Sequence, residues 1–164
     1  MAFTGNEAVL YEKRDRKAYI TLNRPEAMNA LNTAVRQGLR AAMEDLRDDD
    51  DILLGIVTGG GGRAFSAGMD LKERTQLDQA GGLQQREAPR DGRFTELGVW
   101  KPLIAAIDGY CLAGGLELAL ECDIRIATQQ SRFGLPEPRR SLLAGYGLHN
   151  LSRMIPLGHA LYIQ

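Results

Sequence analysis

The stretch LIAAIDGYCLAGGLELALECDIRIAT, residues 103–128, predicts the fold class. Its first five residues are apolar and of strand length, as expected for a strand that is covered on both faces. Two glycines at 114 and 115 then lead into the helical pattern LELALECD, and DIRIAT reads as a further strand. A strand, a helix and another strand in succession indicate an α/β protein.

The sequence on the amino-terminal side continues this alternation. Residues 8–22 give two β-prone runs around a charged turn, which predicts a hairpin. Apolar residues then recur at helical spacing between Thr33 and about Arg47, with Thr33 as the expected N-cap. The run ILLGIVTG predicts another covered strand. We expect a mobile loop over residues 75–91, followed by a helix that continues to Trp100.

Length and composition indicate one soluble domain, residues 1–164, with 44% hydrophobic and 25% charged residues. The net charge of -1 favours neither nucleic acid nor an anionic membrane as a partner. Two cysteines and two histidines without ligand spacing predict no disulfide framework and no metal site. Because the sequence shows neither a signal peptide nor a membrane-spanning run, we expect a cytoplasmic protein.

The glycines at the start of the predicted helix are the first candidate for a functional site. A helix amino terminus has free N–H groups and a positive dipole end, and Gly114 would let a ligand reach the backbone there. Glu117 follows one helical turn later, where a carboxylate can act as a general acid or base. The alternatives are purely structural: glycines that permit close packing, and an acid that stabilises the helix dipole.

Two further segments have similar features. In AFSAGMDLKE, the small residues Ala67 and Gly68 precede Met69, whose N–H could face a cleft, while Asp70 could cap the next turn. In RFGLPEPRR, the flanking prolines hold Glu137 on a stiff loop, which suits a catalytic carboxylate as well as an ordinary polar turn.

Other enzyme classes fit the sequence less well. The stretch ILLGIVTGGGGRA contains a dinucleotide-binding pattern, but the region where an acidic residue should end a second strand is rich in Gln and Gly. The same glycines lack the Lys-Ser/Thr ending of a phosphate-binding loop. Ser66 lacks the G-x-S-x-G context of a serine hydrolase.

Four segments in order, LNRPEAMNAL, AFSAGMDLKE, KPLIAAIDGYCLAGGLELALECDIRIAT and RFGLPEPRR, resemble the successive signatures of the enoyl-CoA hydratase/isomerase (crotonase) superfamily. The resemblance runs from about residue 8 to the end. It implies a ClpP/crotonase-like spiral of ββα units, from which a carboxy-terminal helical part of the family is missing. It also implies a homotrimer or dimer of trimers when the full-length chain is present.

The resemblance further implies an acyl-CoA thioester substrate. The N–H groups of Met69 and Gly114 would form an oxyanion hole for the thioester carbonyl. Glu117 and Glu137 would act together on a water that adds to a 2-enoyl-CoA, beside the small residue Gly145. A family isomerase can work with one carboxylate at the position of Glu137, so isomerisation or another family reaction remains an alternative.

Coenzyme A would enter as part of the substrate, and no separate cofactor is expected. The resemblance implies binding by the segments that contain Arg24, Ala27, Ala67, Asp70, Leu71 and Lys72. Arg24 and Lys72 could meet phosphates or could be ordinary surface charges. Tyr146, Arg139 and Arg140 depart from the common family pattern and have no assigned role. An alternative of another class is a non-catalytic CoA-binding or assembly module.

Overall fold

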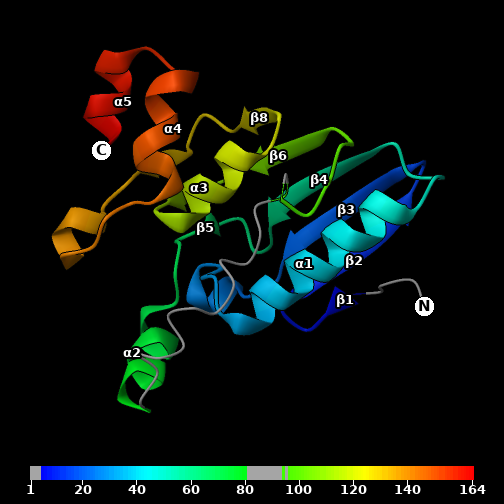
Figure 1. Ribbon diagram of the computed structural model, residues 1–164, viewed down its shortest axis with the longest axis horizontal. Helices are drawn as coiled ribbons and strands as arrows, with labels where there is room; N and C mark the ends of the chain where they lie inside the picture. Colours follow the sequence, from blue (N-terminus) through cyan, green and yellow to red (C-terminus); the bar gives the residue numbers. More distant parts are fainter. Residues whose placement is uncertain (1–4, 81–93, 95) are drawn as a thin grey trace.

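A computed structural model describes residues 5–80, 94 and 96–164 and shows two β-sheets with helices packed against them (Figure 1). The larger sheet has six strands, in the spatial order β1 (Gly5–Asn6), β2 (Val9–Arg14), β3 (Lys17–Leu22), β4 (Leu54–Gly59), β6 (Leu103–Ile107) and β8 (Ile124–Ala127). From β3 to β8 the strands are parallel.

The predicted hairpin is confirmed as the antiparallel pair β2 and β3. Its turn places Asp15 and Arg16 at φ angles of 50° and 60°. Two consecutive residues with positive φ match the right-handed twist of the flanking strands, which is why such turns close tight hairpins.

The smaller sheet consists of the parallel strands β5 (Ala64–Ser66), β7 (Tyr110–Leu112) and β9 (Arg132–Gly134). Each of these strands follows a strand of the larger sheet and precedes a helical segment. The helical segments are α2 (Leu71–Gln79), α3 (Gly114–Glu121) and the 3-10 helix η3 (Glu137–Arg140), after which come α4 (Tyr146–Met154) and α5 (Leu157–Ile163). This threefold β, β, helix progression confirms the predicted α/β spiral.

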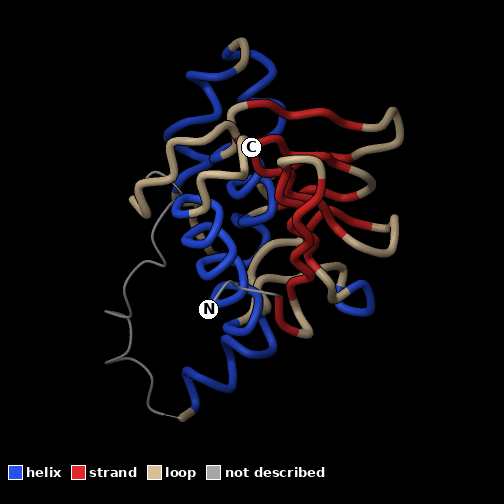
Figure 2. Tube along the Cα trace, turned by 90° about the vertical axis from the view of Figure 1, so that its right-hand side faces the viewer, coloured by secondary structure: helices blue, strands red, loops and turns tan. Residues whose placement is uncertain are grey.

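Helix α1 (Thr33–Asp48) covers one face of the larger sheet (Figure 2). Val35, Leu39, Met43 and Leu46 form its buried stripe, as their spacing predicted. Each such side chain contributes about 1.5–3 kcal/mol when it leaves water. The expected N-cap at Thr33 is wrong, because the side chain of the extended residue Asn32 accepts the N–H of Val35 at 2.9 Å.

The prediction for residues 75–91 is partly wrong. Residues 75–79 belong to α2, a polar helix with no buried residue that projects from the body (Figure 1). Without an apolar stripe, its sequence carries no helical periodicity. Residues 81–91 lie outside the described residues. The expected helix up to Trp100 is also wrong for residues 96–98, which form a turn.

The acidic run of residues 48–51, at the end of α1, contacts β2 and Lys101. Asp49 pairs with Lys13 of β2 at 2.6 Å, and the buried Lys101 binds the carbonyl oxygens of Leu46 and Asp49. A cation there satisfies carbonyl groups that the last helical turn leaves free.

Over the described residues, no helix is long and apolar enough to cross a membrane.

Candidate active site

The segment before α2 and the start of α3 approach each other at backbone contact distance. Gly68 has a φ angle of +89°, and a Cβ built on it would lie 2.6 Å from the Ala113 Cβ and 2.9 Å from the Gly114 nitrogen. A Cβ built on Gly114 would lie 3.7 Å from the Met69 nitrogen. The backbone nitrogen atoms of Met69 and Gly114 therefore lie close to each other.

These two N–H groups have no hydrogen-bond acceptor in the described part of the chain, whereas three other backbone N–H groups close to them do. Ala67 donates to Met28, Asp70 donates to Leu31, and Ala113 donates to Gly134. Gly114 is the first residue of α3, where a helix cannot bind its own N–H groups. The positive end of the helix dipole adds to the attraction for an anionic oxygen at this position.

The backbone of Ala113 orients the Gly114 N–H. Its φ and ψ angles of 52° and -130° are unfavourable for a residue with a side chain and typically cost about 1–3 kcal/mol. Two hydrogen bonds hold it there: its N–H donates to Gly134, and its carbonyl oxygen accepts from Glu117 at 3.0 Å. The fold thus imposes this conformation from both sides of the residue.

Glu117 lies one turn into α3 with its carboxylate fixed in position. Its Oε1 accepts the N–H of Gly147, in the first turn of α4, at 2.7 Å. A side chain on Gly147 would press against its neighbours, since a Cβ would lie 2.9 Å from the Leu135 Cδ1 and 3.4 Å from the Glu117 Cγ. The carboxylate of Glu117 is therefore held between two helices.

Glu137 begins η3 directly after Pro136 and is half-buried. Burial raises the pKa of its carboxyl group, a hydrogen bond from its own backbone lowers the pKa, and the charge of Glu117 raises it; the net pKa is above the ordinary value. Its Oε2 is buried and has no hydrogen-bond partner among the described residues. An orphaned buried carboxyl oxygen needs a partner, which a bound water or ligand would supply.

One cavity of about 510 Å³ brings four predicted site residues together: Met69, Gly114, Glu117 and Glu137. Ala67 and Leu71, which the resemblance assigned to CoA binding, also line it. The structure thus collects residues from three separate segments of the chain around one space.

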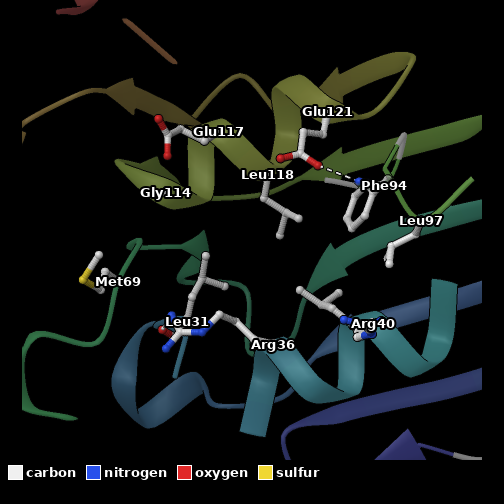
Figure 3. Close-up of a pocket in the computed structure, with 11 residues that line it drawn as sticks. Leu31, Arg36, Arg40, Met69, Phe94, Leu97, Gly114, Glu117, Leu118 and Glu121 are labelled. Atoms are coloured by element: carbon white, nitrogen blue, oxygen red, sulfur yellow. Dashed lines mark hydrogen bonds between the residues drawn. The ribbon is translucent and has the colours of Figure 1, made fainter. Parts of the chain in front are cut away.

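A second cavity, of about 240 Å³, shares Met69, Gly114 and Glu117 with the first and extends between α1 and α3 (Figure 3). Leu118 of α3 and Leu31 point toward each other across it, and Phe94 and Leu97 close its other end (Figure 3). The two cavities therefore meet at these three shared residues. An elongated ligand could pass from one cavity into the other beside them.

Of the other predicted residues, Arg24 and Asp70 are bound to each other at 2.9 Å. Asp70 also caps α2 by accepting the N–H groups of Lys72 and Glu73, as predicted. Burial opposes ionisation of Asp70, but the bonds from Glu73 and Arg24 outweigh it and hold its pKa below the usual value. Arg24 is thus committed to a partner within the protein.

The remaining predicted residues take different positions. Ala27 ends the 3-10 helix η1 (Pro25–Ala27), and Lys72 is exposed at the start of α2; neither lines the two cavities. Gly145 lies beside Glu117, because a Cβ built on it would be 3.9 Å from Oε1. In the described ranges, no group of three or more His, Cys, Asp or Glu residues could hold a metal ion.

The sequence did not reveal Asn29 and Gly147. The side chain of Asn29 is completely buried, accepts the N–H of Arg24 and donates to the carbonyl oxygens of Gly60 and Ala64. It fixes the loop before α1 against the start of β5. Its φ angle of 54° lies in the left-handed region, which asparagine tolerates better than most residues. The residue type is therefore the one sequence signal for this position.

Known proteins resemble this chain in sequence over most of its length. Residues 12–164 match the family model described as enoyl-CoA hydratase/isomerase. The (E)-benzylidenesuccinyl-CoA hydratase of Thauera aromatica is 40% identical over 151 residues, which cover 90% of this chain and 58% of that protein. The short-chain-enoyl-CoA hydratase of Clostridium acetobutylicum is 36% identical over 93% of this chain and 59% of its own.

Among solved structures, the enoyl-CoA hydratase of Mycobacterium tuberculosis H37Rv matches with a TM-score of 0.81 and 45% identity, over 96% of this chain and 61% of that one. The chain spans about 60% of the length of the relatives that it matches. On the family model, the relatives and the fold together, the chain belongs to the enoyl-CoA hydratase/isomerase (crotonase) superfamily.

Proposed function

We propose that the protein adds water to the double bond of a 2-enoyl-CoA and releases a 3-hydroxyacyl-CoA. The observation that carries this proposal is the pair of uncommitted N–H groups, of Met69 and Gly114, in a cavity that both Glu117 and Glu137 line. Family relatives named as hydratases support it.

The N–H groups of Met69 and Gly114 bind the thioester carbonyl oxygen. They stabilise the negative charge that this oxygen gains as water attacks C3. Because the donors are backbone groups fixed before the substrate arrives, they need no reorganisation during the reaction, and one such donor typically contributes about 3–4 kcal/mol.

The two carboxyl groups have complementary roles in the addition. Glu117 accepts a proton from the attacking water, and the hydrogen bond that its Oε1 accepts from the Gly147 N–H holds the carboxylate in place for this step. Glu137 delivers a proton to C2, since its raised pKa favours the protonated form. The hydroxyl group ends on C3 and the proton from Glu137 on C2. Return of the proton from Glu117 to Glu137 restores both groups, so the sum of the steps is the addition of one water.

The substrate lies across both cavities. The pantetheine arm leaves the site past Ala67 and Leu71, and Lys72, which has no ion-pair partner among the described side chains, is the cation closest in sequence to that exit. Arg24 contributes indirectly, by fixing Asp70 and with it the start of α2. Coenzyme A is part of the substrate, and no other cofactor takes part.

The whole protein is proposed to act as a homotrimer or dimer of trimers in the cytoplasm.

The alternative reaction is isomerisation of an enoyl-CoA, which needs only one carboxylate, at Glu137. The presence of both glutamates on one cavity favours hydration.

Hydration of crotonyl-CoA tests the proposal, and the reaction is measured as the loss of enoyl-thioester absorbance. Glu117→Gln and Glu137→Gln should each lower kcat by roughly 100-fold or more, the usual contribution of a general acid or base. Glu12→Gln, on an exposed side chain of β2, is the matched control and should leave kcat unchanged.

Native turnover no faster than that of the Glu117→Gln/Glu137→Gln double variant would refute the hydratase proposal. If such a protein still bound CoA thioesters, the result would favour the alternative of a non-catalytic binding module.

A further inference from the structure

Two consecutive arginines line the larger cavity together with Glu137. Arg139 and Arg140 lie in η3, are exposed, and have no side-chain hydrogen bond or ion pair within the described parts of the chain. Some other arginines are bound to carboxylates, as Arg24 is to Asp70 and Arg74 is to Asp78. Arg139 and Arg140 instead present two uncommitted guanidinium groups on the wall of the candidate site.

These arginines do not serve as partners for the two glutamates. Glu117 is held by the Gly147 N–H, and Oε2 of Glu137 has no hydrogen-bond partner among the described residues. A guanidinium group prefers to bind an oxyanion through two parallel N–H bonds, and neither glutamate provides such an arrangement here. The two positive charges are thus available to a ligand.

The charge of the cavity explains why a ligand would need them. The carboxylate of Glu117 lies on the cavity wall, and it would repel an anionic ligand unless cations offset that charge. Because Arg139 and Arg140 line the same cavity as Met69 and Gly114, an anionic group that meets the arginines shares that cavity with the N–H pair.

We propose that Arg139 and Arg140 form an oxyanion-binding subsite for an anionic group of the substrate itself. The inference rests on the proposed function, since it takes the substrate to be a CoA thioester. Two groups have the required chemistry. One is a carboxylate at the far end of an acyl group of about five carbons, which spans roughly 6 Å at ordinary bond lengths; the other is a CoA phosphate carried back by a bent pantetheine arm.

Calorimetric titration with four saturated thioesters, which cannot be hydrated, tests the subsite without turnover. The probes are butyryl-CoA, glutaryl-CoA, butyryl-pantetheine and glutaryl-pantetheine. They are titrated into the native chain and into the Arg139→Gln/Arg140→Gln variant. Arg153→Gln is the matched control, because Arg153 is an exposed arginine of α4 that lines neither cavity.

If the arginines bind phosphate, the double variant loses about tenfold in affinity for both CoA thioesters and nothing for the pantetheine thioesters. If they bind carboxylate, the loss of about tenfold falls on both glutaryl thioesters. Either loss should shrink as salt is added, because the groups are exposed. The Arg153→Gln variant should stay within twofold of the native chain for every probe.

The inference is overturned if the double variant stays within twofold for all four probes, or if the native chain binds none of them. These results are separate from the crotonyl-CoA assay. Arginine-dependent binding without turnover would refute the hydratase proposal and leave the subsite standing, whereas turnover without arginine dependence would do the reverse. An unchanged urea midpoint of the double variant shows that it folds as the native chain does.

Discussion

Replacement of Gly114 by alanine should separate catalysis from stability. A Cβ at this position would lie 3.6 Å from Leu31 and 3.7 Å from the Met69 nitrogen, which are ordinary van der Waals distances. The protein therefore has room for the methyl group, and alanine is intrinsically better than glycine in a helix by up to about 1 kcal/mol. The variant should be at least as stable as the native chain.

The same methyl group occupies the space beside the two N–H groups where the carbonyl oxygen would bind. We expect it to cost about as much as the loss of one oxyanion donor, roughly 3–4 kcal/mol, or a fall of about 100- to 1000-fold in kcat. Stability is measured by urea unfolding and activity by hydration of crotonyl-CoA.

Two other glycines provide the controls. Gly115→Ala should be strongly destabilised, because its Cβ would overlap the carbonyl oxygen of Ser66. Gly158→Ala in α5 should change neither property by much, since no atom lies within 4 Å of the added group. A Gly114→Ala variant that keeps more than half of the native kcat would refute binding of the carbonyl at this position. A variant that unfolds would show that Gly114 serves packing.

Three further predictions concern stability. Glu137→Gln should stabilise the protein more at about pH 7 than at about pH 4, as measured by urea unfolding. The pKa of Glu137 is higher in the folded state than in the unfolded state, so the stability of the native chain falls as pH rises from the ordinary pKa to the raised one, and the variant lacks this loss. A stability difference that does not change with pH would contradict this. Asn29→Ala should cost about 3 kcal/mol, because the carbonyl oxygens of Gly60 and Ala64 lose a buried donor; a cost below about 1 kcal/mol in the same assay would argue against that role. Ala113→Gly should raise the unfolding free energy by about 1 kcal/mol through relief of backbone strain, and a lower thermal midpoint would count against it.

The sequence predicted the elements that carry a hydrophobic pattern. The hairpin of residues 8–22, the stripe of α1 and the junction at Gly114 all follow from residue spacing and the chemistry of glycine. The alternation of strands and helices then indicated the α/β class. Helix α2 was not predicted, because none of its residues is buried and its sequence therefore lacks an apolar periodicity.

Features that depend on tertiary contacts were beyond the sequence. Asn32 and Thr33 are both good N-caps, and only the backbone conformation selects Asn32. Arg24 has a side chain that can bind phosphate, but it binds Asp70 instead, a residue 46 positions away that no local pattern connects with it. The anchoring of Glu117 by Gly147 likewise requires α4 to pack on α3, which no local pattern predicts.

The pair at Met69 and Gly114 consists of main-chain atoms supplied by two segments 45 positions apart in the numbering. Conventional mutagenesis alters what surrounds such donors and leaves the donors in place. Exchange of either amide for an ester during chemical assembly of the polypeptide would delete one hydrogen while keeping every side chain, and would measure the contribution of each donor separately.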